Sequence, residues 1–174
     1  MKNNIPFYCN NSGGDEQYTP ESTVLLLLPY IQHLKDKIIW CPFDKEDSQF
    51  VQVLEDHGFN VVYSHIDYGQ DFFEYEPEHW DVIISNPPYK NKRKFWEHCI
   101  ELGKPFLLLL PVNILSDATI NETLADDNYE VQMLIPKKRT KFYNARTGEV
   151  GQQPTFKAVY FGINILEKQI IFER

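Results

Sequence analysis

The stretch DVIISNPPYKNKRK, residues 81–94, decides how this chain folds and where its chemistry lies. An apolar run leads into Ser-Asn-Pro-Pro-Tyr, and the chain then becomes strongly basic. Neither Pro87 nor Pro88 can donate a backbone hydrogen bond, and each fixes its own φ, so a strand cannot continue through them. We therefore expect a buried strand that stops at a rigid turn, with Asn86 and Tyr89 as the polar and aromatic groups that the turn presents.

The segments on either side of this stretch alternate between strand-like and helical patterns. We expect strands at 37–43, 59–66, 80–85 and 104–112, and helices at 22–35, 44–58 and 93–103. Such alternation predicts an α/β fold, with a mainly parallel central sheet and helices on both of its faces. The last third is β-leaning at 129–136, 140–144, 157–164 and 169–173, which predicts antiparallel strands at the end of the sheet.

The domain organisation follows from length and composition. A chain of 174 residues with 43% hydrophobic and 24% charged residues is typical of one globular domain. Residues 1–17 are polar and rich in Gly and Asn, so we expect a loose leader there. The sequence has no insertion large enough for a separate target-recognition domain, and target recognition would then fall to a partner subunit or a second copy.

Charge, cysteines and hydropathy narrow the function classes. The net charge of −8 argues against a protein that coats nucleic acid by charge alone. Nine of the 17 basic residues nevertheless fall in two stretches, 90–94 and 137–146. These stretches are either two solvated turns or a rim of the binding site that faces phosphates. The three cysteines lack metal-ligand spacing, so we expect reduced thiols, no metal site and a cytoplasmic location. The longest apolar runs are too short to span a bilayer.

The Ser-Asn-Pro-Pro-Tyr turn suits the binding of a planar amine. In open α/β sheets, ligands bind beyond the carboxyl ends of the strands, where Asn86 is expected. The Asn86 side-chain oxygen and the Pro87 carbonyl are two acceptors held close together, which match an NH2 group with two donors. Tyr89 offers a face for a flat ring. Because the turn contains no acid, thiol or metal ligand, the bound nitrogen must itself be the nucleophile. The alternative is a structural turn in which Asn86 caps a backbone group.

The stretches 17–20 (QYTP), 40–44 (WCPFD) and 69–73 (GQDFF) precede the Asn-Pro-Pro-Tyr turn, and 153–161 (QPTFKAVYF) follows it. In this order they resemble the amino-group methyltransferases that use S-adenosyl-L-methionine, specifically the adenine-N6 branch. The resemblance implies a Rossmann-like methyltransferase fold and transfer of a methyl group to adenine in nucleic acid, DNA rather than RNA. It implies that the turn is catalytic and that residues at 18–20, 41–44, 67 and 71–72 bind the cofactor. The implied catalytic residues are Asn86, Pro87, Pro88 and Tyr89, and the implied cofactor-binding residues are Tyr18, Thr19, Pro20, Cys41, Pro42, Phe43, Asp44, Asp67, Asp71 and Phe72.

The resemblance also implies individual roles. Asp71 would accept a hydrogen bond from the cofactor adenine amine, with Phe72 beneath the ring, and Asp67 would bind ribose hydroxyls unless it lies in a surface turn. Phe156 would stack on the target base or pack in the core. The basic residues beside the turn would contact phosphates, and these are Lys90, Lys92, Arg93 and Lys94.

One departure from the family pattern concerns the turn after the first long strand. The family has glycines after Pro-Phe that let the backbone approach the cofactor, and here Asp-Lys-Glu-Asp-Ser-Gln follows Pro42-Phe43. Asp44 could pair with the methionine ammonium, or it could cap the next helix. Two rival functions follow: methylation of a protein glutamine amide, which the same turn could hold, and a non-catalytic module that binds nucleic acid or cofactor.

Overall fold

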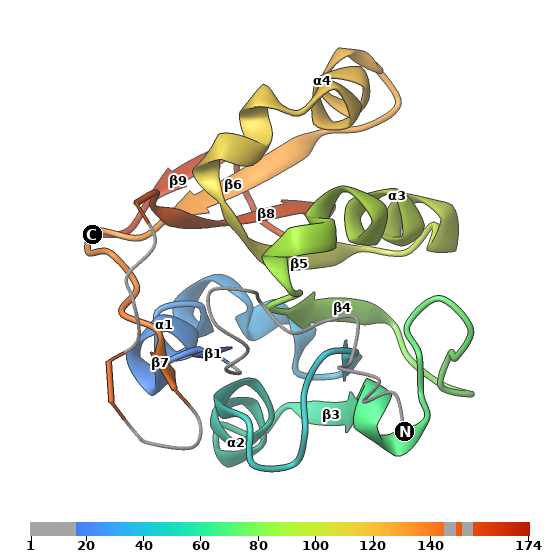
Figure 1. The fold of residues 1–174 in the computed structure, drawn as a ribbon, viewed down its shortest axis with the longest axis vertical. Coiled ribbons are helices and arrows are strands. Elements are labelled where there is room, and N and C mark those ends of the chain that lie inside the picture. The colour runs from blue at the N-terminus through green and yellow to red at the C-terminus, as the bar shows by residue number, and fades with distance from the viewer. Residues whose placement is uncertain (1–16, 145–148, 151–154) are drawn as a thin grey trace, which may run out of the picture.

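The computed structural model describes residues 17–144, 149–150 and 155–174, and the expected leader at 1–16 lies outside them. A seven-stranded sheet in the order β3-β2-β4-β5-β8-β6-β9 forms its centre, and β1 pairs with β7 in a second, two-stranded sheet (Figure 1). The strands are β1 Gln17–Tyr18, β2 Ile38–Cys41, β3 Asn60–Tyr63, β4 Val82–Ser85, β5 Phe106–Pro111, β6 Val131–Ile135, β7 Tyr143–Asn144, β8 Ala158–Ile163 and β9 Ile170–Phe172. The α-helices are α1 Glu21–Leu25, α2 Gln49–Asp56, α3 Lys92–Leu102 and α4 Ala118–Ala125.

Strand directions confirm a mainly parallel α/β sheet that ends with antiparallel pairing. β3, β2, β4 and β5 are mutually parallel. β8 runs antiparallel to both β5 and β6, whereas β9 is parallel to β6. The antiparallel contacts of the large sheet therefore all come from β8, and the carboxyl ends of the other six strands lie along one edge.

Helices cover both faces of the sheet, as the alternating sequence predicts. Along β5, Leu107 and Leu109 belong to the cluster that includes the buried side chains of α1 and α2. Phe106, Leu108 and Leu110 belong to the opposite cluster, with α3 and α4. All six β5 residues are buried, which explains why this strand reads as a continuous apolar run.

Helix boundaries differ from the sequence expectation in two places that matter for the site. The expected helix at 22–35 is α1 followed by two 3₁₀ turns at 28–30 and 32–34, because Pro29 cannot donate the next α-helical hydrogen bond. The expectation that Asp44 caps the second helix is wrong, since α2 begins at Gln49 with Ser48 as its N-cap. The strand expected at 104–112 ends at Pro111, and Val112 begins a 3₁₀ turn that runs to Ser116. The sequence suggested nothing for residues 113–125, which contain the rest of this turn and α4.

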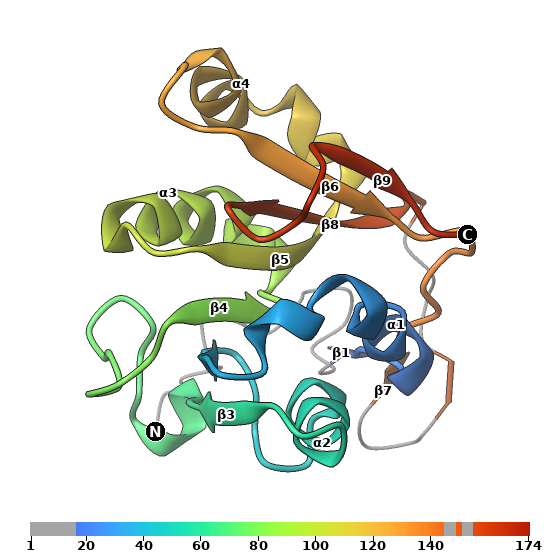
Figure 2. The same ribbon diagram turned by 180° about the vertical axis from the view of Figure 1, so that it is seen from behind.

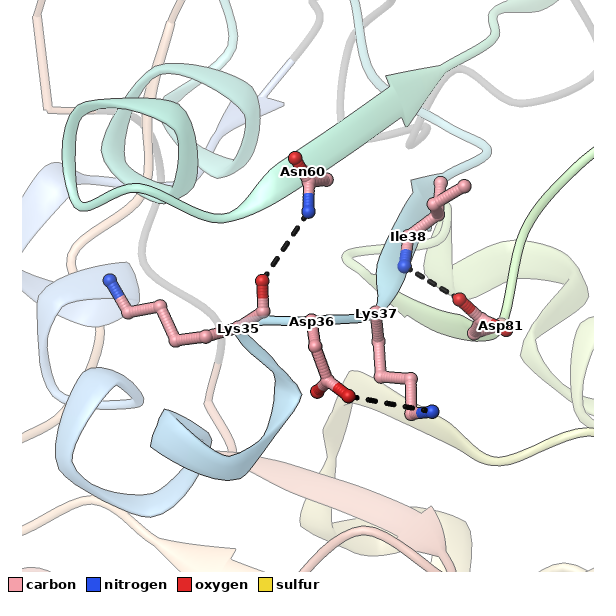
Figure 3. A network of polar contacts seen from close by, with 6 residues as sticks. All are labelled: Lys35, Asp36, Lys37, Ile38, Asn60 and Asp81. Carbon is pink, nitrogen blue, oxygen red and sulfur yellow. Dashed lines mark hydrogen bonds and ion pairs between the residues drawn. The ribbon is translucent and has the colours of Figure 1, made fainter.

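The amino ends of the strands are joined by structural polar contacts (Figure 3). Asp81 Oδ2 accepts a hydrogen bond from the Ile38 backbone N–H at 2.8 Å, which ties β4 to β2. Asn60 Nδ2 donates to the Lys35 carbonyl at 3.3 Å, which ties β3 to the chain entering β2. This edge holds the sheet together and leaves the carboxyl edge for chemistry. Within the described ranges, no helix has the length and apolarity that crossing a membrane requires.

Candidate functional site at the carboxyl edge of the sheet

The strand order places a topological switch point between β2 and β4. The chain leaves β2 toward β3 on one side and then returns across β2 to form β4 on its other side, as Figures 1 and 2 show. Connections diverge from the carboxyl ends of two such strands, and open α/β sheets bind ligands in the crevice this creates. Cys41 ends β2 and Ser85 ends β4, so the Asn-Pro-Pro-Tyr turn starts at this point of the fold.

Asp44 bridges the two strand ends. Its side chain is buried and accepts hydrogen bonds from Ser48 Oγ at 2.6 Å and Ser85 Oγ at 2.5 Å. Burial raises the pKa of the Asp44 carboxyl to about 6, while the two hydroxyl donors oppose that shift. Serine hydroxyls bring no charge, so a cation from a ligand would complement this carboxylate. Of the two roles left open for Asp44, the helix cap is excluded and the pairing with an ammonium group stays available.

Asn86 presents a buried acceptor with no hydrogen-bond partner among the described residues. Its Nδ2 donates to Thr19 Oγ1 at 3.0 Å, whereas its Oδ1 is shielded from solvent and accepts no hydrogen bond. A buried polar atom without a partner costs about 1–3 kcal/mol. Few such atoms occur in native proteins, and each calls for an explanation. A donor supplied by a ligand would satisfy Asn86 Oδ1. The alternative that Asn86 caps a backbone group is not observed, since its Nδ2 donates to a side-chain hydroxyl.

Tyr89 lies in an aromatic group that combines three segments. Its ring centroid is 6.0 Å from that of Phe142 and 5.8 Å from that of Phe156. Burial raises the pKa of Tyr89, so its hydroxyl stays protonated at neutral pH. Phe142 is 4% exposed and Phe156 is half-buried. Phe156 therefore lies beside Tyr89, and its stacking on a target base stays a prediction. Sequence reasoning missed Phe142, because it is an ordinary aromatic residue in a β-leaning segment.

A second buried polar atom follows the turn. Asn91 Nδ2 has no hydrogen-bond partner among the described residues, and Asn91 precedes α3 without capping it through its side chain. The sequence analysis did not single out Asn91. An unpartnered donor within five residues of an unpartnered acceptor is a signal that only the folded arrangement shows.

The stretch Gln17-Tyr18-Thr19-Pro20 reaches the turn through the small sheet. β1 pairs with β7 in the register Tyr18–Tyr143, and the two tyrosine rings meet edge to face at 6.2 Å. Figures 1 and 2 both show this sheet beside α1. Thr19 is buried, and Pro20 is the N-cap of α1. The structure thus brings Thr19 to Asn86, which the sequence did not predict.

Asp67 lies in a surface turn, the 3₁₀ turn Ile66–Tyr68 after β3, where its side chain is 39% exposed. Its position is therefore that of the surface-turn alternative, and a contact with ribose stays a prediction. Lys45 Nζ lies 2.6 Å from Asp67 Oδ2, and this hydrogen bond lowers the pKa of Asp67. The Asp67 backbone N–H donates to His65 Nδ1 at 3.1 Å. Asp67 therefore stays ionised at neutral pH. Ribose hydroxyls would share this carboxylate with Lys45, which lies in the turn after β2 that contains no glycine.

Asp71 and Phe72 have different degrees of access to a ligand. Asp71 is half-buried, and its Oδ1 accepts a hydrogen bond from the Phe73 N–H at 3.0 Å. Phe72 is 1% exposed and packs against Trp40 and Phe43, at centroid distances of 5.3 and 4.8 Å. A ligand ring could contact Phe72 only if these neighbours moved. Phe43 is the half-buried residue of the Cys41-Pro42-Phe43 stretch, whose other two members are buried.

The two basic stretches follow the carboxyl ends of parallel strands, β4 and β6, so they lie along the same edge as Asn86. Lys90, Arg93 and Lys94 are exposed and Lys92 is half-buried. Arg93 pairs with Glu97 at 3.0 Å on α3, which occupies part of its charge. In the second stretch the exposed residues are Lys137, Lys138, Arg139 and Lys141, and Arg146 lies outside the described residues.

Comparisons with known proteins leave the family unassigned. No family model matches the chain, and no curated protein matches it. One similar solved structure is a dimethyladenosine transferase from Plasmodium falciparum, with 10% sequence identity and a TM-score of 0.46 over 84% of this chain. This chain spans 62% of that protein, less than two thirds of its length.

Proposed function

We propose that this chain is an S-adenosyl-L-methionine-dependent methyltransferase that acts on the exocyclic N6 amine of adenine in nucleic acid, DNA in preference to RNA. One observation carries the proposal. Asn86 Oδ1, the first side-chain acceptor after β4, is buried at the switch point of the sheet without a hydrogen-bond partner among the described residues. Tyr89 lies in the same turn, and Phe142 and Phe156 from two other segments pack beside its ring. An amine donor attached to a flat ring satisfies both features.

The residues on the β2 side fit the proposed cofactor in charge. Asp44 is a buried carboxylate that accepts hydrogen bonds from two neutral hydroxyls, and an ammonium group would neutralise it. Asp67 is ionised and partly exposed at the end of β3, where hydroxyl groups can reach it. The turn between Phe43 and Ser48 contains no glycine that would let its backbone approach the cofactor closely. The Asp44 N–H already donates a hydrogen bond to the Ser64 carbonyl at 3.2 Å. Side chains rather than backbone amides therefore make the main contacts in this proposal.

The turn prepares the amine for reaction. When bound, S-adenosyl-L-methionine supplies a methyl group on a sulfonium, which is already activated toward a nucleophile. Asn86 Oδ1 and the Pro87 carbonyl accept the two amine N–H groups and direct the nitrogen lone pair toward that methyl. Asn86 Oδ1 and the Pro87 carbonyl would hold the two N–H groups while the nitrogen gains the methyl group, and one of these protons would then pass to solvent. Hydrogen bonds to these acceptors grow stronger as positive charge develops on the nitrogen, which stabilises the transition state.

Access to Asn86 Oδ1 constrains the substrate. This oxygen is shielded from solvent, so an amine reaches it only when the side chains that cover it move. A base in a duplex cannot reach such a site within the stack and would have to be extruded into it. Tyr89 and Phe156 would then contact the extruded ring. The basic residues along the same edge would hold the flanking phosphates, which position the strand without reading its sequence.

The test begins with the unaltered protein. Titration calorimetry with S-adenosyl-L-methionine should show binding, and a filter assay should show transfer of labelled methyl groups to DNA more than to RNA. A glutamine-containing peptide is the third substrate in the assay. Transfer to the peptide alone would replace adenine with a protein amide as the target. An absence of cofactor binding would refute the methyltransferase function altogether.

A further inference from the structure

We infer that Thr19 is a positioning residue for the reaction: its hydroxyl fixes the orientation of the Asn86 amide so that Oδ1 faces the substrate amine. This inference deepens the proposed function and rests on it. The observation that carries it is the hydrogen bond from Asn86 Nδ2 to Thr19 Oγ1, 3.0 Å long, which joins residues 67 positions apart in the chain.

The backbone of Asn86 is constrained on both sides, which leaves its side-chain torsions as the remaining freedom. Ser85 is held by its hydrogen bond to Asp44, and Pro87 has a fixed φ. Pro87 also restricts the backbone of Asn86 itself. A primary amide has an acceptor at one end and a donor at the other. If it rotated by half a turn, the Asn86 NH2 group would face the NH2 group of the substrate, and two donors would meet.

Thr19 limits this rotation because it is itself held in place. A partial rotation of the amide breaks the Nδ2–Oγ1 hydrogen bond, and a half-turn, which the hydroxyl could accommodate by donating to Oδ1, leaves the two NH2 groups facing each other. It is 6% exposed and lies directly after β1, whose Tyr18 pairs with Tyr143 of β7. On the other side, Pro20 is the N-cap of α1, and the Thr23 carbonyl in that helix accepts a hydrogen bond from Tyr160 OH at 2.8 Å. The Thr19 hydroxyl thus has a fixed position from which it accepts the Asn86 donor.

The competing role for Thr19 is a direct contact with the cofactor, which the sequence resemblance implies for the stretch 17–20. The two roles predict different kinetic changes. A cofactor ligand affects the affinity for S-adenosyl-L-methionine. A positioning residue affects turnover at saturating cofactor and substrate, because only the orientation of the acceptor changes.

The test compares Thr19→Val, which keeps the shape and loses the hydroxyl, with Thr19→Ser, which keeps the hydroxyl. Thr19→Val should lower kcat on DNA by on the order of tenfold to a hundredfold, as misplacement of a catalytic group does. Its Kd for S-adenosyl-L-methionine should stay within about twofold of the unaltered protein, whereas Thr19→Ser should retain most of kcat. Thr19→Ala replaces Thr19→Val if the valine variant does not fold.

A second measurement does not depend on turnover. In the two-dimensional amide NMR spectrum, the side-chain NH2 signals of Asn86 can be assigned from their loss in Asn86→Asp. These signals should shift in Thr19→Val and remain near their positions in Thr19→Ser, because only the first change removes the acceptor of Nδ2.

The outcomes separate the inference from the function it rests on. An active unaltered protein with normal kcat in Thr19→Val would overturn the inference and leave the methyltransferase function standing. Weaker cofactor binding with unchanged kcat would make Thr19 a cofactor ligand instead. No methyl transfer by the unaltered protein to DNA, RNA or peptide would overturn both.

Discussion

Ser85 Oγ donates a hydrogen bond to Asp44 Oδ2, joining the last residue of β4 to the turn after β2 across 41 positions of sequence. Asn86, the next residue, carries the unpartnered acceptor. The carboxylate proposed for the cofactor and the amide proposed for the substrate are therefore connected through one serine. A change on either side of this contact has consequences that experiments can separate.

The first prediction concerns stability and pH. The Asp44 carboxyl titrates near its ordinary value of 3.8 in the unfolded chain and at about 6 in the folded protein. Between these pH values the folded state binds more protons, so the free energy of unfolding falls as pH rises through the window. The contribution is on the order of 3 kcal/mol. Urea denaturation from pH 4 to 7 should show the unaltered protein losing stability relative to Asp44→Asn, and a constant difference would contradict the burial of Asp44.

The second prediction concerns the cofactor. If the Asp44 carboxylate pairs with an ammonium group, its protonation below pH 6 removes the partner. The affinity for S-adenosyl-L-methionine should then fall by up to about tenfold for each pH unit below 6. Calorimetry at several pH values measures this, with Asp44→Asn as the control, which should bind weakly without that dependence. The same pH dependence of affinity in both proteins would show that the ammonium group pairs with a residue other than Asp44.

The third prediction concerns Asn86. Asn86→Ala removes the unpartnered acceptor and should abolish methyl transfer, because the alanine side chain has no acceptor for the amine hydrogen bond. Cofactor affinity should be nearly unchanged. Asn60→Ala is the matched control, since Asn60 carries the same amide at the amino edge of the sheet (Figure 3). Near-normal turnover in Asn86→Ala, measured by the filter assay, would remove Asn86 from the catalytic site.

The fourth prediction concerns Asp71. Its Oδ1 accepts the Phe73 N–H at 3.0 Å, so truncation to alanine would also disturb the turn. Asp71→Asn keeps an oxygen for that hydrogen bond and loses only the charge. It should weaken cofactor binding by ~1–3 kcal/mol, as expected for a lost charge-assisted hydrogen bond. Calorimetry that gives the same affinity for both proteins would exclude Asp71 from the cofactor site.

The fifth prediction concerns the basic residues. Replacing Lys92, Arg93 and Lys94 with glutamine should weaken binding to every oligonucleotide alike and flatten the dependence of log affinity on log salt. Each lost duplex contact reduces that slope by roughly 0.9. Arg93 should contribute least, because Glu97 already pairs with it. Lys37→Gln, at the amino edge, is the control.

If the salt slope of the triple variant equals that of the unaltered protein, Lys92–Lys94 are a solvated helix start. Nucleic-acid binding would then depend on the second basic stretch or on a partner subunit. Asn86→Ala should leave the slope unchanged in either case, because the amide carries no charge.

The sequence by itself determined the features that depend on neighbouring residues. The prolines of Asn-Pro-Pro-Tyr end β4 because they lack donors, the apolar run of β5 is buried on both faces, and Gly103 ends α3 with φ at +68°. The alternation of strand-like and helical segments predicted the α/β sheet for the same reason, because the spacing of apolar residues within each segment is a local property of the sequence. These features hold wherever the segment is placed in the fold.

Only the tertiary structure decided which distant side chains meet. Asp44 looked like a helix cap from its spacing, and its actual partners are Ser48, the N-cap residue of α2, and Ser85, at the end of β4. Thr19 reaches Asn86 because β1 pairs with β7, and Phe142 reaches Tyr89 because its segment follows β6 along the same edge. No local period encodes such contacts. They arise when the packing of the sheet and its helices brings the carboxyl ends of the strands together, and the proposed chemistry lies at that edge.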